Sequence, residues 1–344
     1  MRLLLSPFSL LFGIITFVRN KLYDWKCIPS IQYDDIFVIS VGNITVGGTG
    51  KTPFVEYLAR ILSQRCRVAI LSRGYKRTTK GFRFVDQNVI PGMVGDEPYQ
   101  MKRKFPDVVV AVDTNRIRGI AHIRKTHPDT QIILLDDAFQ YRRIKPNLSI
   151  LLADYHRPLY GDSMLPGGRL REWSCFAKRA DMIVVTKSPA AISPDEQRYI
   201  QQRYSRIFPH DIFFASIGYG EPLAVFSNDK SLSISDFSRY DVLLVTGIAH
   251  PKPFETYISQ YAASVQTMIF PDHHAFSEKD ISQIEKKWNT IISTNKILLT
   301  TEKDAVRLQQ MKLPEAIAMH SYYVPVEVNF NGYNPPALSQ LLLR

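Results

Sequence analysis

A glycine-rich loop between an apolar strand and an amphipathic helix constrains the fold of this chain more than any other feature. The apolar run 36–41 leads into a loop that ends in Gly50-Lys51-Thr52. Glycines let backbone N–H groups approach phosphate oxygens, a lysine contacts the β- and γ-phosphates, and a hydroxyl binds Mg²⁺. The residues predicted to bind a nucleotide's phosphates are Thr45, Val46, Gly47, Gly48, Thr49, Gly50, Lys51 and Thr52, with Thr52 also at the metal.

The loop departs at one position from the general phosphate-binding pattern G-x-x-x-x-G-K-[ST]. The first glycine of that pattern would stand at position 45, which is Thr45 in this chain. The alternative interpretation is a glycine-rich turn that joins a strand to a helix and binds nothing. Phe54, Leu58 and Ile61 recur at helical spacing after the loop, so strand, loop and helix arrive in the required order. This order favours nucleotide binding.

Charge and cysteine content narrow the class of protein. The formal net charge of +11 indicates a polyanionic partner, which leaves nucleic acid, an anionic membrane surface and a phosphorylated substrate open. The cysteines, Cys27, Cys66 and Cys175, have no C-x-x-C spacing, so neither a disulfide framework nor a zinc site is predicted and a reducing compartment fits best. Because no recognised nucleic-acid module occurs, no nucleic-acid partner is expected.

The first 26 residues form a strongly apolar segment. The run 3–18 is nearly all apolar, is short for a spanning helix, and is followed by Arg19, Lys21 and Lys26. On a helical wheel, one narrow stripe of small or polar residues contains Arg2, Ser6, Ser9, Gly13, Thr16 and Asn20. The pattern predicts a helix in the interface of an anionic bilayer. A secretory signal and a helix packed on the protein's own core are the alternatives.

Strand-length apolar runs alternate with helical patterns along most of the chain. The runs 67–71, 108–112, 132–135, 148–152 and 182–185 predict a mostly parallel, doubly wound sheet with helices on both faces. After an extended segment at 212–226, a second α/β series begins, and the run 322–330 returns as a strand that could pair with that segment.

The expected fold class is therefore α/β. Two α/β/α sandwich domains of the phosphate-loop NTPase and Rossmann kind, joined by a β-strand linker, follow an N-terminal membrane-associated helix. The expected boundaries are 1–26 for the membrane-associated helix, 27–210 for the nucleotide-binding domain, 211–228 for the β linker, 229–318 for the smaller α/β domain, and 319–344 for the returning strand and a tail helix from Pro336.

Two neighbouring acids end one predicted strand. Asp136 and Asp137 follow the apolar run 132–135, and the C-terminal edge of a parallel strand lies near the phosphate loop, so they are predicted to bind Mg²⁺. The alternative is an aspartate turn that ends the strand. If the strand persists, the two side chains point to different faces, and one is expected at the metal with the other behind it or near the acceptor.

Two further polar runs have open interpretations. In Gly95-Asp-Glu-Pro98 the residues alone favour Asp96 as the N-cap of a helix over 99–104. The run Asp272-His-His274 is compatible with a metal site, an acid-base pair or a polar loop, and a base or orienting role is favoured over zinc because no third ligand stands at suitable spacing.

Basic residues gather in the predicted loops at the same edge of the sheet. Some should face the transferring phosphate or an anionic acceptor, and the rest should be solvated surface charge. These residues are Arg73, Lys76, Arg77, Arg142, Arg143, Arg169 and Arg171.

Together, these motifs resemble the tetraacyldisaccharide 4'-kinase family, the membrane-associated kinases of lipid A biosynthesis. The resemblance is carried in the family's order by the run 41–53, Leu71-Ser-Arg-Gly-Tyr75, Gly95-Asp-Glu-Pro98, Asp136-Asp-Ala-Phe-Gln140, Leu165-Pro-Gly-Gly-Arg-Leu-Arg-Glu172, Phe270-Pro-Asp-His-His274 and Thr301-Glu-Lys-Asp-Ala305. Thr45 is a trait of this family. Small departures are Lys76, Tyr141 where histidine is frequent, and Trp173 where proline is frequent.

The resemblance implies transfer of the γ-phosphoryl group of ATP to the 4'-hydroxyl of a tetraacylated glucosamine disaccharide 1-phosphate, giving lipid IVA, with ATP and Mg²⁺ as cofactors. It implies that Asp96 is the base, assisted by His273 rather than His274, and this role replaces the capping role. Lys51 and Arg171 would neutralise developing charge. Glu172 would arrange the loop that carries Arg171.

The resemblance also implies a location and partners. The chain would work at the cytoplasmic face of the bacterial inner membrane, as a peripheral or monotopic protein on an anionic bilayer surface, with a membrane-embedded anionic glycolipid as acceptor. No obligate protein partner is evident. The alternative from another class is a membrane-recruited, partner-switching phosphate-loop ATPase, whose pattern K-G-G-x-G-K-T has a lysine where this chain has Val46.

Overall fold

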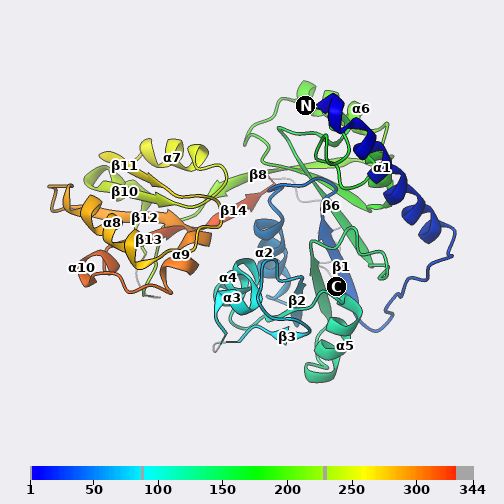
Figure 1. The fold of residues 1–344 in the computed structure, drawn as a ribbon, viewed down its shortest axis with the longest axis horizontal. Coiled ribbons are helices and arrows are strands. Elements are labelled where there is room, and N and C mark those ends of the chain that lie inside the picture. The colour runs from blue at the N-terminus through cyan, green and yellow to red at the C-terminus, as the bar shows by residue number, and fades with distance from the viewer. Residues whose placement is uncertain (1, 87–88, 228–230, 331–344) are drawn as a thin grey trace. The chain divides into compact units, whose positions relative to one another are not determined.

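A computed structural model describes residues 2–86, 89–227 and 231–330. The chain divides into two compact units (Figure 1). The large unit comprises the chain up to Gly218 and the segment that begins at Val328. The small unit is Tyr219–Glu327. The predicted tail helix from Pro336 lies outside the described residues.

Within the described residues, the large unit is built on a nine-stranded sheet in the order β14-β8-β7-β6-β1-β5-β2-β4-β3. Neighbours from β8 to β4 pair in parallel, whereas β3 is antiparallel to β4. The bounds are β1 Phe37–Gly42, β2 Val68–Ser72, β3 Arg83–Phe84, β4 Val109–Val112, β5 Ile132–Asp136, β6 Leu148–Asp154, β7 Met182–Thr186, β8 Ile212–Tyr219 and β14 Val326–Asn329. The predicted α/β class with a mostly parallel sheet is confirmed.

Helices cover both faces of this sheet because alternate side chains of its strands are apolar on both sides. Ile39 of β1 packs with Phe54 of α2, while its neighbour Val38 packs on the other face with Ile120 of α5. The helices of the large unit are α1 Arg2–Asp24, α2 Lys51–Leu62, α3 Pro91–Val94, α4 Asp96–Lys104, α5 Arg116–Thr126 and α6 Pro194–Tyr204, with 3₁₀ turns at Leu159–Gly161 and Ser174–Arg179.

The described part of the small unit contains a five-stranded sheet in the order β11-β10-β12-β13-β9. Its elements are a 3₁₀ turn at Ile234–Arg239, β9 Leu223–Ala224, β10 Asp241–Thr246, α7 Lys252–Ser259, β11 Ser264–Ile269, α8 Glu278–Asn289, β12 Lys296–Thr301, α9 Glu302–Leu308, α10 Glu315–Ala318 and β13 Ser321–Val324. The segment expected as a linker contributes β8 to the large sheet and β9 to the small one, where β9 pairs antiparallel with β13. The expected domain boundaries stay predictions.

The helix α1 rests on the large unit through part of the small-residue stripe (Figure 1, dark blue). Trp173 Nε1 donates a hydrogen bond to the Gly13 carbonyl oxygen over 2.9 Å, and the Gly167 N–H donates to Ser9 Oγ over 2.9 Å. The helix exposes Phe8, Leu10, Leu11, Ile14, Ile15, Phe17 and Val18, and the ring of Phe17 also contacts the ring of Phe176. Among the described helices, none combines the length and apolar character needed to cross a bilayer.

Candidate active site

The carboxyl ends of the parallel strands place the predicted site residues at one edge of the large sheet. Strand β1 lies between β5 and β6, with Val41 opposite Asp136 of β5. The loop between β1 and α2 therefore starts beside the acidic end of β5. Ligands of open α/β sheets bind at this edge, outside the strand ends.

The phosphate loop has the backbone shape that its glycines permit. Gly47 has φ 111° and Gly50 has φ 75°, both in the region that other residues rarely adopt. A side chain at Gly47 or Gly48 would meet no atom within 4 Å, so this surface of the loop is open. Gly50 occupies the N-cap of α2 and has no side chain to cap it, which leaves the first N–H groups of the helix for an anion.

The segment 163–171 holds the phosphate loop from one side. The Val46 N–H donates to the Arg169 carbonyl oxygen over 2.8 Å, and the Arg171 N–H donates to the Ile44 carbonyl oxygen over 2.7 Å. Because Arg171 makes one of these backbone bonds itself and Arg169 makes the other, the backbone of Arg171 is held beside the phosphate loop.

Two cations converge on Asp137. Its Oδ1 lies 3.0 Å from Arg171 Nη2 and 3.8 Å from Lys51 Nζ. Burial by itself would raise the pKa of Asp137, but the positive charges of Lys51 and Arg171 outweigh it and hold that pKa below its ordinary value. The side chain is therefore an ionised carboxylate at neutral pH, between two groups suited to phosphate.

Asp136 has a different environment from its neighbour. It is buried, its Oδ2 accepts a hydrogen bond from Ser72 Oγ over 2.8 Å, and Arg116 donates to its backbone oxygen. Burial, followed by the charge of Asp137, raises the pKa of Asp136. The strand ends at Asp136, and Asp137 leaves it with φ 47°. The two acids therefore differ in the direction of their side chains and in the direction in which their pKa is shifted.

Asp96 is the first residue of α4, not its cap. Gly95, with φ 96°, holds the N-cap position, so the capping role that the residues alone favoured for Asp96 is wrong. A side chain at Gly95 would come within 2.9 Å of the Tyr75 carbonyl oxygen, which places this turn against the loop that follows β2. A carboxylate in the first turn of a helix is stabilised by the helix dipole.

The two histidines of the small unit have separate roles in the structure. His274 Nε2 lies 3.0 Å from Asp280 Oδ2, and its ring stacks on Phe270. His273 has φ 62°, and its Nδ1 lies 3.1 Å from Arg307 Nη2. Arginine only donates, so Nδ1 accepts and a neutral His273 carries its proton on Nε2. The described residues contain no group of three His, Cys, Asp or Glu side chains placed to hold a metal.

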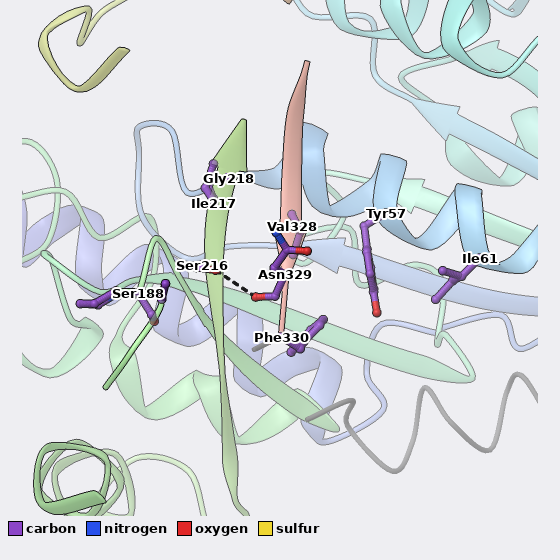
Figure 2. Close-up of a pocket in the computed structure, with 11 residues that line it drawn as sticks. Tyr57, Ile61, Ser188, Ser216, Ile217, Gly218, Val328, Asn329 and Phe330 are labelled. Carbon is purple, nitrogen blue, oxygen red and sulfur yellow. Dashed lines mark hydrogen bonds between the residues drawn. The ribbon is translucent and has the colours of Figure 1, made fainter. Parts of the chain in front are cut away.

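A cavity of about 940 Å³ adjoins the phosphate loop within the large unit (Figure 2). Its walls come from α2, the segment after β7, β8 and β14, with Tyr57 and Ile61 on the helix and Ser216 hydrogen-bonded to Asn329. Ile217, another lining residue, lies 3.2 Å from the position that a β-carbon of Gly50 would take. The cavity and the phosphate loop therefore share a wall.

The structure adds polar residues that sequence reasoning had given no role. Asn43 Nδ2 donates to Thr49 Oγ1 over 2.8 Å, and Gln140 Nε2 donates to the Asn43 carbonyl oxygen over 2.8 Å. Arg116 donates to the backbone oxygen of Asp136 over 3.1 Å. Asn43 lies in the run 41–53 and Gln140 ends the run 136–140, so their place in these motifs could have pointed to a role. Arg116 lies in neither motif, and no sequence pattern pointed to it.

A phosphate loop at the end of β1, acids at the end of the adjacent strand and cations beside them define a phosphate-loop nucleotide-binding protein of the α/β class. The model of the tetraacyldisaccharide-1-P 4'-kinase family, LpxK, matches residues 1–344. The chain belongs to this family.

Individual relatives agree with the family match. The chain is 47% identical over 338 residues to the tetraacyldisaccharide 4'-kinase of Parabacteroides distasonis, covering 95% of this chain and 90% of the relative. It is 42% identical over 330 residues to that of Flavobacterium johnsoniae, covering 96% and 93%. The crystal structure of LpxK from Aquifex aeolicus in complex with ATP is similar with a TM-score of 0.77 and 29% identity, over 100% of this chain and 98% of that one.

Proposed function

We propose that this kinase transfers the γ-phosphoryl group of ATP to the 4'-hydroxyl of a tetraacylated glucosamine disaccharide 1-phosphate, forming lipid IVA in lipid A biosynthesis. The observation that carries the proposal is the placement of Lys51 and Arg171 on Asp137, beside an open phosphate loop, in a member of this family. Phosphoryl transfer needs positioning and charge neutralisation more than covalent help.

The cations in the site supply that neutralisation. Lys51 contacts the β- and γ-phosphates, and Arg171 stabilises charge on the transferring group. The Nε of Arg171 is buried and has no hydrogen-bond partner among the described residues, and a phosphate oxygen would satisfy this donor. Both cations are paired with Asp137 before substrate binds, so little reorganisation is needed when the anion arrives.

The oxygen donors at this edge suit Mg²⁺. Thr52 offers a hydroxyl in the first turn of α2, and Asp136 and Asp137 offer carboxylates at the end of β5. Because the described residues contain no cluster of three acidic, His or Cys ligands, phosphate oxygens and water would complete the coordination. When bound, Mg²⁺ neutralises charge on the β- and γ-phosphates.

Asp96 is the proposed base. It takes the proton of the 4'-hydroxyl while that oxygen bonds to the γ-phosphorus and the bond to the β-γ bridging oxygen breaks, releasing ADP. His273, in the small unit, is the imidazole proposed to assist this base. Its firm placement by Arg307 supports His273 over His274, whose ring nitrogen is engaged by Asp280.

The cavity beside the phosphate loop is the proposed seat of the adenosine. It lies in the same unit as the loop, shares Ile217 with it, and is lined by the aromatic rings of Tyr57 and Phe330 together with backbone groups. A largely apolar pocket with a few polar groups is the usual environment of a nucleoside.

The exposed side of α1 supports a location at the membrane. Besides Phe17, whose ring also contacts Phe176, six large apolar side chains are exposed there, next to Arg19 and Lys21, which suits peripheral or monotopic binding to an anionic bilayer at the cytoplasmic face of the inner membrane. The acceptor glycolipid would be taken from that bilayer. The proposal involves neither nucleic acid nor an obligate protein partner.

The deciding experiment incubates the full chain with γ-labelled ATP, Mg²⁺ and the lipid disaccharide 1-phosphate in detergent micelles. We expect label in the lipid and equimolar ADP. If the lipid stays unlabelled and ATP is hydrolysed only after a partner protein is added, the chain is a partner-switching ATPase instead. A Lys51→Ala variant, which removes the cation from the phosphate loop, is the negative control.

A further inference from the structure

Asn20, on the side of α1 that rests on the large unit, reaches a distant loop. It is 2% exposed, and its Nδ2 donates to Glu172 Oε2 over 2.8 Å, across 152 positions of sequence. The backbone carbonyl oxygen of Asn20 accepts from Arg142 Nη1 over 2.6 Å, and Arg142 also binds Asp24 of the same helix. The C-terminal part of α1 is thus tied to the strand-end loops of the large unit.

Glu172 is a buried carboxylate with every oxygen engaged. It is 2% exposed, and its Oε2 accepts from Asn20 and from Arg179 Nη1 over 2.9 Å. Its Oε1 accepts from Gln140 Nε2 over 2.9 Å and from Arg179 Nη2 over 3.2 Å. A buried carboxylate that loses one of several donors gains a desolvation cost, so its position depends on all of them.

The contacts continue from Gln140 to the phosphate loop. Gln140 Nε2 also donates to the Asn43 carbonyl oxygen over 2.8 Å, and Arg171 Nη2 donates to the same oxygen over 3.0 Å. The side chain of Asn43 donates to Thr49 Oγ1 and lies 3.4 Å from Lys51 Nζ through its Oδ1. An unbroken series of hydrogen bonds therefore runs from α1 to Lys51 and Arg171.

We propose that Asn20 is a positioning residue for phosphoryl transfer, which couples the seating of α1 on the large unit to the placement of Arg171 and Lys51. The proposal rests on the proposed function, because kinase turnover reports on these two cations. When α1 moves, Glu172 loses one of its donors and is held from that side by Arg179 alone, so its bond to Gln140, and through Gln140 the position of Asn43 beside the cations, is less firmly set. The seating of α1 would then affect kcat, in addition to the proposed role of α1 in binding the bilayer.

A second attachment of α1 provides the control. The Trp173 indole donates to the Gly13 carbonyl oxygen, and a side chain at Gly13 would come within 2.6 Å of that ring. This contact holds the helix, and among the described residues the Trp173 indole makes no hydrogen bond to Gln140, Asn43 or the phosphate loop. Trp173→Phe therefore loosens α1 at one point and leaves the series from Asn20 intact.

The test compares the full-length chain with Asn20→Ala, Trp173→Phe, Glu172→Ala and the double variant Asn20→Ala/Glu172→Ala. We expect kcat of Asn20→Ala to fall about tenfold, the effect of one lost hydrogen bond, while KM for the lipid is unchanged. Trp173→Phe should keep kcat within about twofold, and Asn20→Ala should have no further effect once Glu172 is absent. If the losses in kcat of Asn20→Ala and Glu172→Ala add up in the double variant, or if Trp173→Phe loses as much kcat as Asn20→Ala, then Asn20 only anchors the helix and the proposal is wrong.

Hydrogen exchange of residues 43–50 without substrate separates this inference from the proposed function. Asn20→Ala should speed exchange there, because Asn43 and Thr49 lose their fixed frame, and Trp173→Phe should not. If the wild type fails to label the lipid but the exchange differs as expected, the coupling stands and the assigned reaction falls. Identical exchange in both variants overturns the coupling, whatever the activity.

Discussion

Ser72 Oγ donates a hydrogen bond to Asp136 Oδ2 over 2.8 Å, from the end of β2 to the end of β5. This bond only partly offsets the burial of Asp136, and the pKa of its carboxyl group stays raised above the ordinary 3.8. In Asp137, next in the chain, the charges of Lys51 and Arg171 lower the pKa. Asp136 and Asp137 therefore make opposite contributions to the way the free energy of unfolding changes with pH.

Asp136→Asn should stabilise the protein at neutral pH while it lowers activity. A raised pKa in the folded state gives stability below about 3.8, and this stability is lost as the pH rises through the folded value, so ionised Asp136 is unfavourable at pH 7. We expect the Tm at pH 7 to rise by about 2 °C and the difference to vanish near pH 4. Thermal unfolding across this pH range checks it, and a lower Tm at pH 7 would contradict it.

Asp137→Asn should destabilise the protein at neutral pH, the opposite of the effect expected for Asp136→Asn. A lowered pKa gives stability above the ordinary value, which is lost as the pH falls through the folded value. Without the carboxylate, Lys51 and Arg171 face each other uncompensated, which should cost about 1 kcal/mol at pH 7, a modest amount because water screens these partly exposed groups. Urea denaturation at pH 7 measures this loss. The loss should shrink as the pH falls below 4, and a constant difference would argue against the ion pairs.

Asp96→Asn should depress turnover and spare nucleotide binding. As the proposed base, Asp96 acts on the acceptor proton, so kcat should fall about 100-fold with KM for ATP unchanged. Asp107→Asn removes an exposed acid just beyond the same helix and is the matched control. Steady-state kinetics with varied ATP provide the measurement. Parallel loss of ATP affinity would make Asp96 a structural residue of the α4 turn.

The two histidines should separate activity from stability. His273→Gln should lower kcat about tenfold with little change in Tm, because its ring is placed by Arg307 rather than packed in the core. His274→Gln removes the contact with Asp280 and the stacking on Phe270, so it should lower Tm and leave kcat nearly intact. Kinetics and thermal unfolding of both variants decide the assignment, and reversed behaviour would exchange the two roles.

Filling the cavity beside the phosphate loop should weaken ATP binding. Ala190 lines this cavity and is exposed, so Ala190→Trp should raise KM for ATP about tenfold without loss of stability. Ala191→Trp puts the same ring on the adjacent exposed residue and should leave KM unchanged. If both variants bind ATP like the wild type, the adenosine lies elsewhere.

Charge on the exposed side of α1 should release the protein from membranes. Leu11→Glu with Ile14→Glu places carboxylates among the outward apolar side chains, and sedimentation with vesicles containing anionic lipid should fall about tenfold. Tyr199→Glu, on an exposed residue of α6, is the control for a charge elsewhere on the large unit. Unchanged sedimentation of the double variant would rule out α1 as the anchor.

Much of the fold was predictable because parallel strands buried on both faces read as continuous apolar runs. The expected runs 132–135 and 182–185 match β5 and β7 to within one residue at each end. Short elements such as β3 and α3 were missed, since two to four residues carry no periodic signal. Asp96 was misplaced by the residues alone, because Gly95 could also take the cap position.

The sequence by itself determined the chemistry: a phosphate loop with Lys51, acids that end a strand, and a family whose motifs span the chain. These are local patterns, in which residue type and spacing carry the physical requirement. Only the tertiary structure decided that Asp136 and Asp137 titrate in opposite directions, and that Asn20 meets Glu172. Burial and partners from distant strands and loops create those properties, and no local pattern of residues specifies which distant groups will meet.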